Sequence, residues 1–351
     1  MNTEYIVERE IAATPGFNHI QTAHCENGVT TSLLQHYGVK QITEPLAFGI
    51  GSGLFYIYIP FMKVNNGPAI SFRTMPGMIF KRTCKSLDIP VFRKKFSSHQ
   101  KAQQELDERL QQGHPAACQV GVYYLTYFPK EYRFHFNAHN IIVTGKQGDN
   151  YVISDPVMET LATLSTYELE RVRFARGPLA PRGQLYYPKE KRPVTDEQVK
   201  KAIYTGIKRN VRDMLHIPGN IAGISGIKYT ANKIKKWKNK LGDEKSRSYL
   251  AQLVRMQEEI GTGGGGFRFI YGAFLQQAHA YHSIDELMDI SKQFTNAGDL
   301  WRNAAIQAAG IYKGRLTAQA DYDTMGDHLL EIADLEKKAF LNLAAVLKKM
   351  K

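Results

Sequence analysis

The chain has 351 residues, of which 43% are hydrophobic and 23% charged, a globular composition long enough for about two domains. Intrinsic disorder, a collagen-like sequence and a disulfide scaffold are therefore excluded. The 46 basic and 33 acidic residues give a net charge of +13, which favours an acidic partner: nucleic acid, an anionic membrane surface or an acidic carrier protein.

The cysteines and the apolar runs of the sequence indicate in which cellular compartment the protein is expected. Cys25, Cys84 and Cys118 are too few and too scattered for a disulfide framework or a zinc cluster, which favours a reducing compartment. The start MNTEYIVERE has no apolar core, so we expect no signal peptide. The longest uncharged run, residues 45–62, contains three glycines and two prolines and is interpreted as buried loop and strand. We expect a soluble, cytoplasmic protein without stable membrane insertion.

The first half of the chain mixes predicted helices and strands. Residues 30–37 and 101–111 show helical periodicity. Runs rich in β-branched and aromatic residues predict strands of a well-buried sheet at residues 54–59, 119–127, 140–144 and 151–154.

A linker and a change of pattern divide the chain. After Arg173, the segment FARGPLAPRGQLYYPKEKRP has four prolines and two glycines, which is typical of a linker. Helical periodicity then predicts helices at residues 196–215, 245–260, 267–281, 284–294, 299–310 and 324–349. We therefore predict an α+β protein, with a mixed domain over residues 1–190 and an all-α domain over residues 191–351.

A basic cluster stands out in the second half. The stretch from Lys228 to Lys240 has six lysines and no acidic residue. Such a run is typical of a solvated helix face, and docking of an acidic protein is the alternative. No nucleic-acid motif accompanies it, so we do not expect nucleic-acid binding.

The segment FNHIQTAHCENGVTTSLLQHYG, residues 17–38, contains the first candidate for chemistry. Cys25 directly precedes a helical pattern, so its sulfur would lie at a helix N-terminus, where the macrodipole and backbone N–H groups favour the thiolate. A side-chain amide such as Gln21 or Asn18 is expected to complete an oxyanion hole. The alternative is a small buried hydrophobe, the role we expect of Cys84 and Cys118.

A base and an orienting carboxylate follow in HFNAHNIIVTGKQGDNYVISDP. His139 opens one predicted strand, and Asp155 ends the returning strand, so a hairpin would bring the two side chains together. His19, His24 and His135 are competing histidines. A cysteine, then a histidine on a strand, then an aspartate on the next strand is the order of papain-like enzymes.

Longer segments carry a family resemblance. HCENGVTTSLLQHYG, ITEPLAFGIGSGLFYIYIP and AHNIIVTGKQGDNYVISDP resemble the butirosin-biosynthesis BtrH family, whose N-terminal domain is similar to papain-like bacteriocin-leader peptidases. This likeness covers roughly residues 17–175. TGGGGFRFIYGAFLQQA resembles a glycine-rich signature of the helical domain that accompanies the family. The resemblance implies a papain-like cysteine-protease-type domain, followed by an all-α domain that shapes the acceptor site.

The resemblance also implies acyl transfer, because the family's named member moves an aminoacyl group from a carrier-protein phosphopantetheine thioester to an amine of an aminoglycoside. Cys25 would then take the acyl group, His139 would act as base and Asp155 would orient it. The implied partners are an acyl carrier protein and a small-molecule amine. Phosphopantetheine would enter only with the donor, without another cofactor or a metal.

Three questions stay open at this point. The same triad using water would make a cysteine peptidase or amidase. A non-catalytic protein with a basic binding surface is a further alternative, in which Cys25 is buried and inert. A homo-oligomer is also compatible with the sequence.

Two further residues are predicted to bind substrate. Glu44 precedes Pro45 and the FGIGSG stretch, which is not a dinucleotide fingerprint, and it is expected either to be structural or to bind the substrate amine. The tetraglycine of residues 263–266 precedes a predicted helix, a geometry that can hold an anion. With Arg268 it is expected to contact a substrate carboxylate or the phosphopantetheine phosphate, the alternative being a packed loop.

Overall fold

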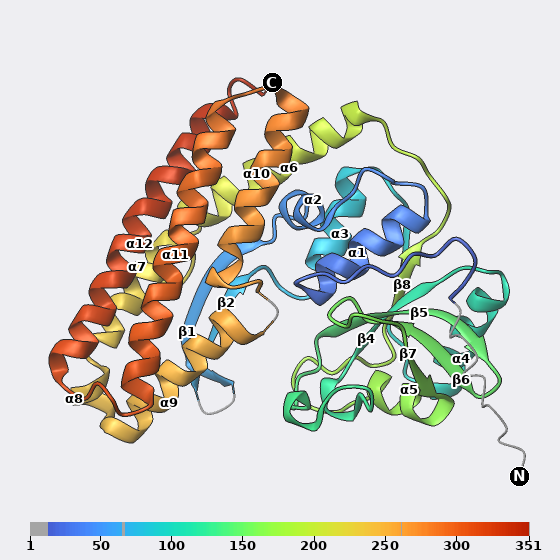
Figure 1. Cartoon of the computed structure of the whole chain (residues 1–351), viewed down its shortest axis with the longest axis horizontal. Helices are drawn as coiled ribbons and strands as arrows, with labels where there is room; N and C mark the ends of the chain where they lie inside the picture. The colour runs from blue at the N-terminus through green and yellow to red at the C-terminus, as the bar shows by residue number, and fades with distance from the viewer. Residues whose placement is uncertain (1–12, 65–66, 261, 351) are drawn as a thin grey trace, which may run out of the picture. The chain divides into compact units, whose positions relative to one another are not determined.

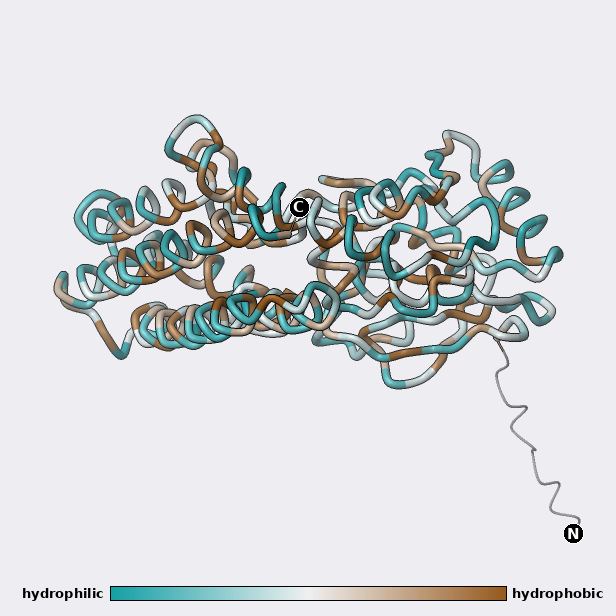
Figure 2. The backbone as a smooth tube through the Cα atoms, turned by 90° about the horizontal axis from the view of Figure 1, so that it is seen from above, coloured by the Kyte–Doolittle hydropathy of each residue, from teal (hydrophilic) through white to brown (hydrophobic). Residues whose placement is uncertain are grey.

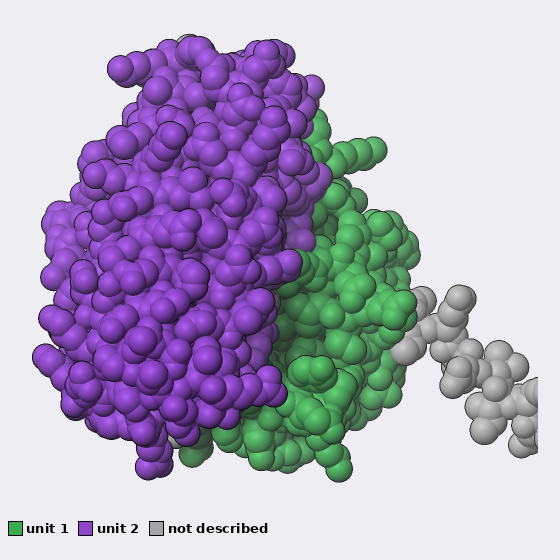
Figure 3. All heavy atoms as spheres, turned by 60° about the vertical axis from the view of Figure 1, so that its left-hand side comes forward, with its two compact units in different colours: residues 1–41, 90–193 green, residues 42–89, 194–351 purple. Residues whose placement is uncertain are grey.

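The computed structural model describes residues 13–64, 67–260 and 262–350 (Figure 1). They fall into two compact units, coloured separately in Figure 3. Unit 1 combines the chain up to residue 41 with residues 90–193, and unit 2 combines residues 42–89 with the chain from residue 194.

Unit 1 is built on a six-stranded antiparallel sheet with the strand order β3-β8-β4-β5-β6-β7. Its elements are α1 (Cys25–His36), β3 (Val91–Lys94), α4 (His99–Gln111), β4 (Ala116–Val120), the 3₁₀ turns η1 (Val122–Tyr124) and η2 (Lys130–Tyr132), β5 (His139–Gln147), β6 (Asn150–Ser154), β7 (Ala162–Ser165), α5 (Thr166–Arg173) and β8 (Leu185–Pro188).

Helices cover both faces of this sheet. Leu106 of α4 and Leu169 of α5 share one buried cluster with Ile141 and Ile153 of the central strands. Helix α1 packs on the other face, against β4, β5 and β8 (Figure 1). Because both faces are covered, the adjoining stretches at residues 141–143 of β5 and 151–153 of β6 are apolar and fully buried.

Unit 2 combines a two-stranded antiparallel sheet with helices. Its elements are α2 (Glu44–Ile50), β1 (Leu54–Val64), β2 (Gly67–Arg73), α3 (Met78–Ser86), α6 (Asp196–Leu215), α7 (Gly223–Ile234), α8 (Trp237–Leu241), α9 (Asp243–Val254), the π turn η3 (Arg255–Glu259), the 3₁₀ turn η4 (Gly265–Phe267), α10 (Arg268–His282), α11 (Glu286–Tyr312) and α12 (Gln319–Val346).

Aromatic packing joins the early and late segments of unit 2. The buried Trp301 ring of α11 meets Phe72 of β2 edge-on at 5.1 Å and stacks on Tyr56 of β1 at 5.9 Å. Gly49 of α2 lies so close to Phe274 that a Cβ there would come within 2.1 Å of the ring. Figure 2 shows hydrophobic and hydrophilic residues alternating along the helical tubes, as expected when one side of each helix is buried.

The expected α+β class is confirmed, with a sheet-containing N-terminal part and a helical C-terminal part. The division of the chain differs from the linear boundary at residue 190, because residues 42–89 pack with the later helices. The predicted strand at residues 54–59 therefore lies in the two-stranded sheet of unit 2. The described elements from residue 196 onward are all helices, as predicted. None of the described helices combines the length and the hydropathy that a membrane crossing requires.

Candidate active site

Cys25 is the first residue of α1, where the sequence pattern placed it. His24 caps the helix, and its Nδ1 accepts a hydrogen bond from the Asn27 backbone N–H at 3.3 Å. The Cys25 side chain is buried, with 7% of the residue exposed. Its position at the positive end of the helix dipole favours the thiolate over the thiol.

A close approach holds this helix end beside the loop that follows β6. A Cβ on Gly28 would lie 2.1 Å from the Thr22 Oγ1 and 2.4 Å from the Pro156 Cβ, so only glycine fits. The Thr22 backbone N–H donates to the Pro156 carbonyl at 2.7 Å. These contacts bring Cys25 next to the end of the strand that precedes Asp155.

His139 and Asp155 meet as the hairpin predicts. The imidazole Nε2 lies 2.6 Å from Asp155 Oδ2, and both residues are buried. Asp155 also accepts hydrogen bonds from the Tyr127 hydroxyl at 2.9 Å and from the Val157 backbone N–H at 3.2 Å. The imidazole also interacts with the Cys25 side chain.

These neighbours decide the charge of the imidazole. Burial alone lowers the pKa of His139, but the Asp155 carboxylate and then the Cys25 sulfur raise it to about 10. Because two negative charges face one ring, the imidazolium is favoured at neutral pH. Such a ring stabilises a neighbouring thiolate and can later donate a proton to a leaving group.

Two residues that the sequence analysis missed complete this cluster. Asn140 donates from Nδ2 to the Cys25 Sγ at 3.9 Å and to the Ala138 carbonyl at 3.1 Å. The Tyr186 hydroxyl donates to Asn140 Oδ1 at 2.9 Å and so fixes the orientation of the amide. The adjacency of Asn140 to His139 was the available signal, whereas Tyr186 lies 46 positions further along the chain.

Gln21 does not join these contacts. Its side chain is exposed, and no hydrogen bond joins it to Cys25 or His139 among the described residues. The side-chain amide that lies beside the sulfur is that of Asn140. A role of Gln21 or Asn18 in an oxyanion hole stays a prediction.

The other histidines and cysteines of unit 1 have separate environments. His19 interacts with Ser154 Oγ at 2.8 Å, and His135 stacks on Tyr123 at 4.1 Å. Cys118 is fully buried in the sheet, and burial raises the pKa of its thiol. In unit 2, burial also raises the pKa of the Cys84 thiol.

Arg268 does not face a substrate, which corrects the expectation from sequence. Its side chain is 0% exposed and donates to Glu336 from Nε at 2.7 Å and from Nη2 at 2.9 Å. Its Nη1 donates to the Gly266 carbonyl at 2.7 Å. The guanidinium is therefore committed to the core of unit 2.

The tetraglycine loop holds an anion from its own chain. The Gly265 backbone N–H donates to the Glu258 carboxylate at 3.1 and 3.2 Å. All four glycines have positive φ angles, between 55° and 84°, which accounts for their residue type. The packed-loop alternative therefore describes residues 263–266 better than a substrate site does.

Glu44 begins α2 in unit 2, with Thr43 as the N-cap. An acidic residue in the first turn stabilises a helix by interacting with the dipole. Its predicted contact with a substrate amine stays a prediction.

The lysine cluster of residues 228–240 is partly neutralised by acidic residues from outside the cluster. Lys228 pairs with Asp334 and Lys238 with Asp243, each at 2.6 Å, and Lys235 pairs with Asp327. Such surface pairs contribute little to stability. They agree with the interpretation of a solvated helix face.

Comparisons with known proteins address the family. Residues 24–156 match the family described as butirosin biosynthesis protein H, N-terminal, and residues 167–343 match the domain of unknown function DUF4872. Among curated proteins, none matches the chain. A solved structure of a C39-like peptidase from Bacillus anthracis is similar at 15% identity, over 52% of this chain and 100% of that chain, with a TM-score of 0.35. From its two family matches, the chain belongs to the BtrH-like family, with a BtrH N-terminal region followed by the DUF4872 domain.

Proposed function

We propose that the protein is a cysteine-dependent acyltransferase that takes an acyl group from a carrier-protein thioester and passes it to an amine. One observation carries the proposal: His139 lies between the buried Asp155 carboxylate and the Cys25 sulfur, at the start of a helix. This is the arrangement that activates a thiolate nucleophile. The match of this region to the butirosin biosynthesis family supports transfer over other uses of the thiolate.

In the first step, the Cys25 thiolate attacks the thioester carbonyl. The carbon–sulfur bond to the donor breaks, and the departing thiolate takes a proton from the His139 imidazolium. In the second step, His139 accepts a proton from the attacking amine, the amide bond forms and the Cys25 thiolate leaves. Exchange between two thioesters is nearly balanced in free energy, and formation of the amide then drives the reaction.

Asn140 is the side chain we assign to the developing oxyanion. Its amide nitrogen lies beside the nucleophilic sulfur and is held by Tyr186 and by the Ala138 carbonyl. A donor fixed in advance stabilises charge as it appears, without reorganisation. In the resting protein the same donor contributes to stabilising the thiolate.

The experiment is intact-protein mass spectrometry after mixing the protein with a panel of acyl-pantetheine thioesters and then adding amines. Cys25→Ala removes the nucleophile, and Cys84→Ala is the matched control at a buried cysteine. An adduct that requires Cys25 and is discharged faster by an amine than by water supports acyl transfer. Equally fast discharge by water would identify a hydrolase. If Cys25 fails to load in a folded protein, the proposal is rejected.

A further inference from the structure

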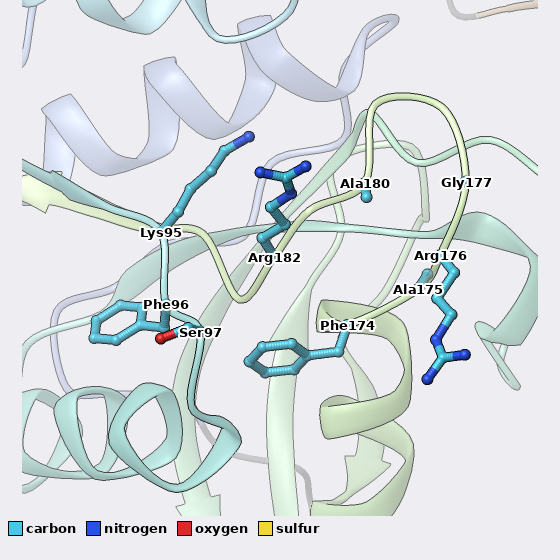
Figure 4. Close-up of a pocket in the computed structure, with 9 residues that line it drawn as sticks. All are labelled: Lys95, Phe96, Ser97, Phe174, Ala175, Arg176, Gly177, Ala180 and Arg182. Atoms are coloured by element: carbon cyan, nitrogen blue, oxygen red, sulfur yellow. The ribbon is translucent and has the colours of Figure 1, made fainter.

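A cationic cavity of about 660 Å³ opens in unit 1, apart from the Cys25 cluster (Figure 4). Lys95 and Ser97 line it from the segment after β3, and Arg176 and Arg182 line it from the loop between α5 and β8. Figure 4 shows Lys95 and Arg182 extending side by side, with Arg176 beyond the turn of the loop. No acidic residue is among the described residues that line this cavity.

The three cations have no acidic partner within the part of the chain that the structure describes. None of the side chains of Lys95, Arg176 and Arg182 makes an ion pair or a hydrogen bond there. By contrast, Lys146 on the same sheet pairs with Asp107 at 2.9 Å. Like charges around a concavity raise the local potential and attract a counter-ion. The cavity is therefore suited to an anionic ligand.

Hydrogen bonds hold the lining segments in place before any ligand arrives. The Arg182 carbonyl accepts from the Phe96 backbone N–H at 2.9 Å, which ties the two segments together. Arg182 has a φ of 53°, a left-handed conformation that is uncommon outside glycine.

The same loop is bonded to the strands that carry the active-site cluster. Asn137 donates from Nδ2 to the carbonyls of Arg176 and Pro178, both at 3.0 Å, and precedes His139 by two residues. Gln119 donates from Nε2 to the Leu179 carbonyl at 2.9 Å and pairs with Asn140 across β4 and β5. Hydrogen bonds within unit 1 therefore join the loop that lines the cavity to the segments beside His139 and Asn140.

We propose that this cavity binds the phosphate of the phosphopantetheine arm that delivers the acyl group. The inference rests on the proposed acyl transfer and names where its donor is held. Arginine forks and a lysine suit a phosphate, to which Ser97 can add a hydroxyl donor. The apolar walls formed by Phe96 and Phe174 suit the aliphatic part of the arm. The site replaces the predicted one at Arg268, whose guanidinium is buried.

The phosphopantetheine arm can belong to a carrier protein or to free coenzyme A. A second cavity next to the first could hold the nucleotide part of coenzyme A. It has a volume of about 440 Å³, shares Phe174 and Arg176 with the first and is lined by Tyr123, Tyr124 and Tyr167. Aromatic rings of this kind can stack on a nucleotide base. Comparing coenzyme A with phosphopantetheine distinguishes the two sources.

Binding is measured by calorimetry on the Cys25→Ser protein, which cannot react with the ligand. We expect 4′-phosphopantetheine to bind at least about tenfold more tightly than pantetheine, which lacks the phosphate. The triple variant Lys95→Gln, Arg176→Gln, Arg182→Gln should abolish this ratio. Equal affinities of the two ligands for the unsubstituted cavity would overturn the proposal.

A matched triple variant controls for net charge. Lys101→Gln, Lys130→Gln and Lys189→Gln remove the same three charges from exposed positions of unit 1 outside the cavity. This control should keep the phosphate-dependent ratio. If both triple variants lose it to the same extent, the effect is one of overall charge and the site is refuted. Circular dichroism and the melting temperature establish that each variant is folded.

Kinetics separate this inference from the proposed function. Loading of Cys25 by acyl-pantetheine tests acyl transfer alone, whereas the ratio of the loading rates of acyl-phosphopantetheine and acyl-pantetheine tests the cavity. Normal loading without a phosphate effect rejects only the cavity. Phosphate-dependent binding without loading rejects only the acyl transfer. If coenzyme A and phosphopantetheine bind with equal affinity, the cavity recognises the phosphopantetheine arm. If coenzyme A binds much more tightly and this binding needs the three cations, the cavity binds a nucleotide instead.

Discussion

The replacement Asp155→Asn tests the charge that holds the His139 imidazolium. Asparagine keeps the size of the side chain and an oxygen that can accept from the imidazole Nε2, but it removes the carboxylate charge. The pKa of His139 is about 10, against 6.5 for an ordinary histidine. At 1.36 kcal/mol per pH unit, this difference corresponds to about 5 kcal/mol in favour of the charged ring.

An opposite charge in contact typically moves a pKa by about 1–3 pH units. We therefore expect Asp155→Asn to lower the pKa of His139 by about that amount, because burial then opposes the charge with less compensation. The Cys25 sulfur still contributes, so part of the increase should remain. The upper limb of the pH profile for Cys25 acylation should move down by the same amount, since acylation needs the imidazolium.

The assay follows the His139 ring signal by NMR from about pH 5 to pH 11, with the resonance assigned through His139→Gln. Stability should follow the same titration. A histidine whose pKa is raised by folding contributes stability that is fully present below about pH 6.5 and is lost as the pH rises through about 10. The free energy of unfolding should therefore fall more steeply over this interval in the wild type than in the variant. A His139 pKa that is the same in both proteins would refute the reasoning.

Three further predictions address the nucleophile, the oxyanion and the core. At about pH 6, iodoacetamide should label Cys25 far faster than Cys84 and Cys118, because burial raises the thiol pKa values of those two. Peptide mass mapping measures the labelling, and equal rates at the three cysteines would favour an inert Cys25. Asn140→Ala should slow the acylation of Cys25 by about a hundredfold or more, whereas Gln21→Ala should have little effect on this rate. A larger loss of rate in Gln21→Ala would show that Gln21 stabilises the oxyanion. Arg268→Met removes the counter-charge of the buried Glu336 carboxylate and should lower the free energy of urea unfolding by about 3–5 kcal/mol. Adding Glu336→Met should restore only part of this loss, because the Trp301 Nε1–H then loses its acceptor. A cost below about 1 kcal/mol would contradict a buried pair.

Local patterns predicted individual elements well. The helix predicted over residues 196–215 has these bounds in the structure, and it begins at Asp196 because Thr195 and Gln198 form a capping box. The helices predicted at 284–294 and 299–310 are one helix, α11, since Gly298 does not end it but packs against the Phe269 ring. Strand β1 was found, but a strand pattern does not name its partner, so its assignment to the main sheet was wrong.

The candidate site shows the same division between local and distant information. Cys25 at a helix start and the hairpin of His139 and Asp155 are local patterns, and the structure brings all three side chains together. The partners of Asn140 and Arg268 lie 46 and 68 positions further along the chain, and a single sequence carries no signal for such pairs. For this reason the sequence predicts a substrate contact at Arg268, where the structure has a buried ion pair with Glu336.

Residues 42–89 pack in unit 2 with helices that are synthesised much later, which has a consequence for folding during synthesis. On the ribosome, the strand with the sequence LFYIYI emerges well over a hundred residues before Trp301, against which it packs in the finished protein. An apolar, β-prone segment exposed for that time is an aggregation hazard. Unit 1 can close as soon as residue 193 has emerged, while unit 2 must wait for its last helix. Any shortened chain that ends near residue 190 keeps this strand without its cover, so expression yield should recover only when α11 and α12 are included.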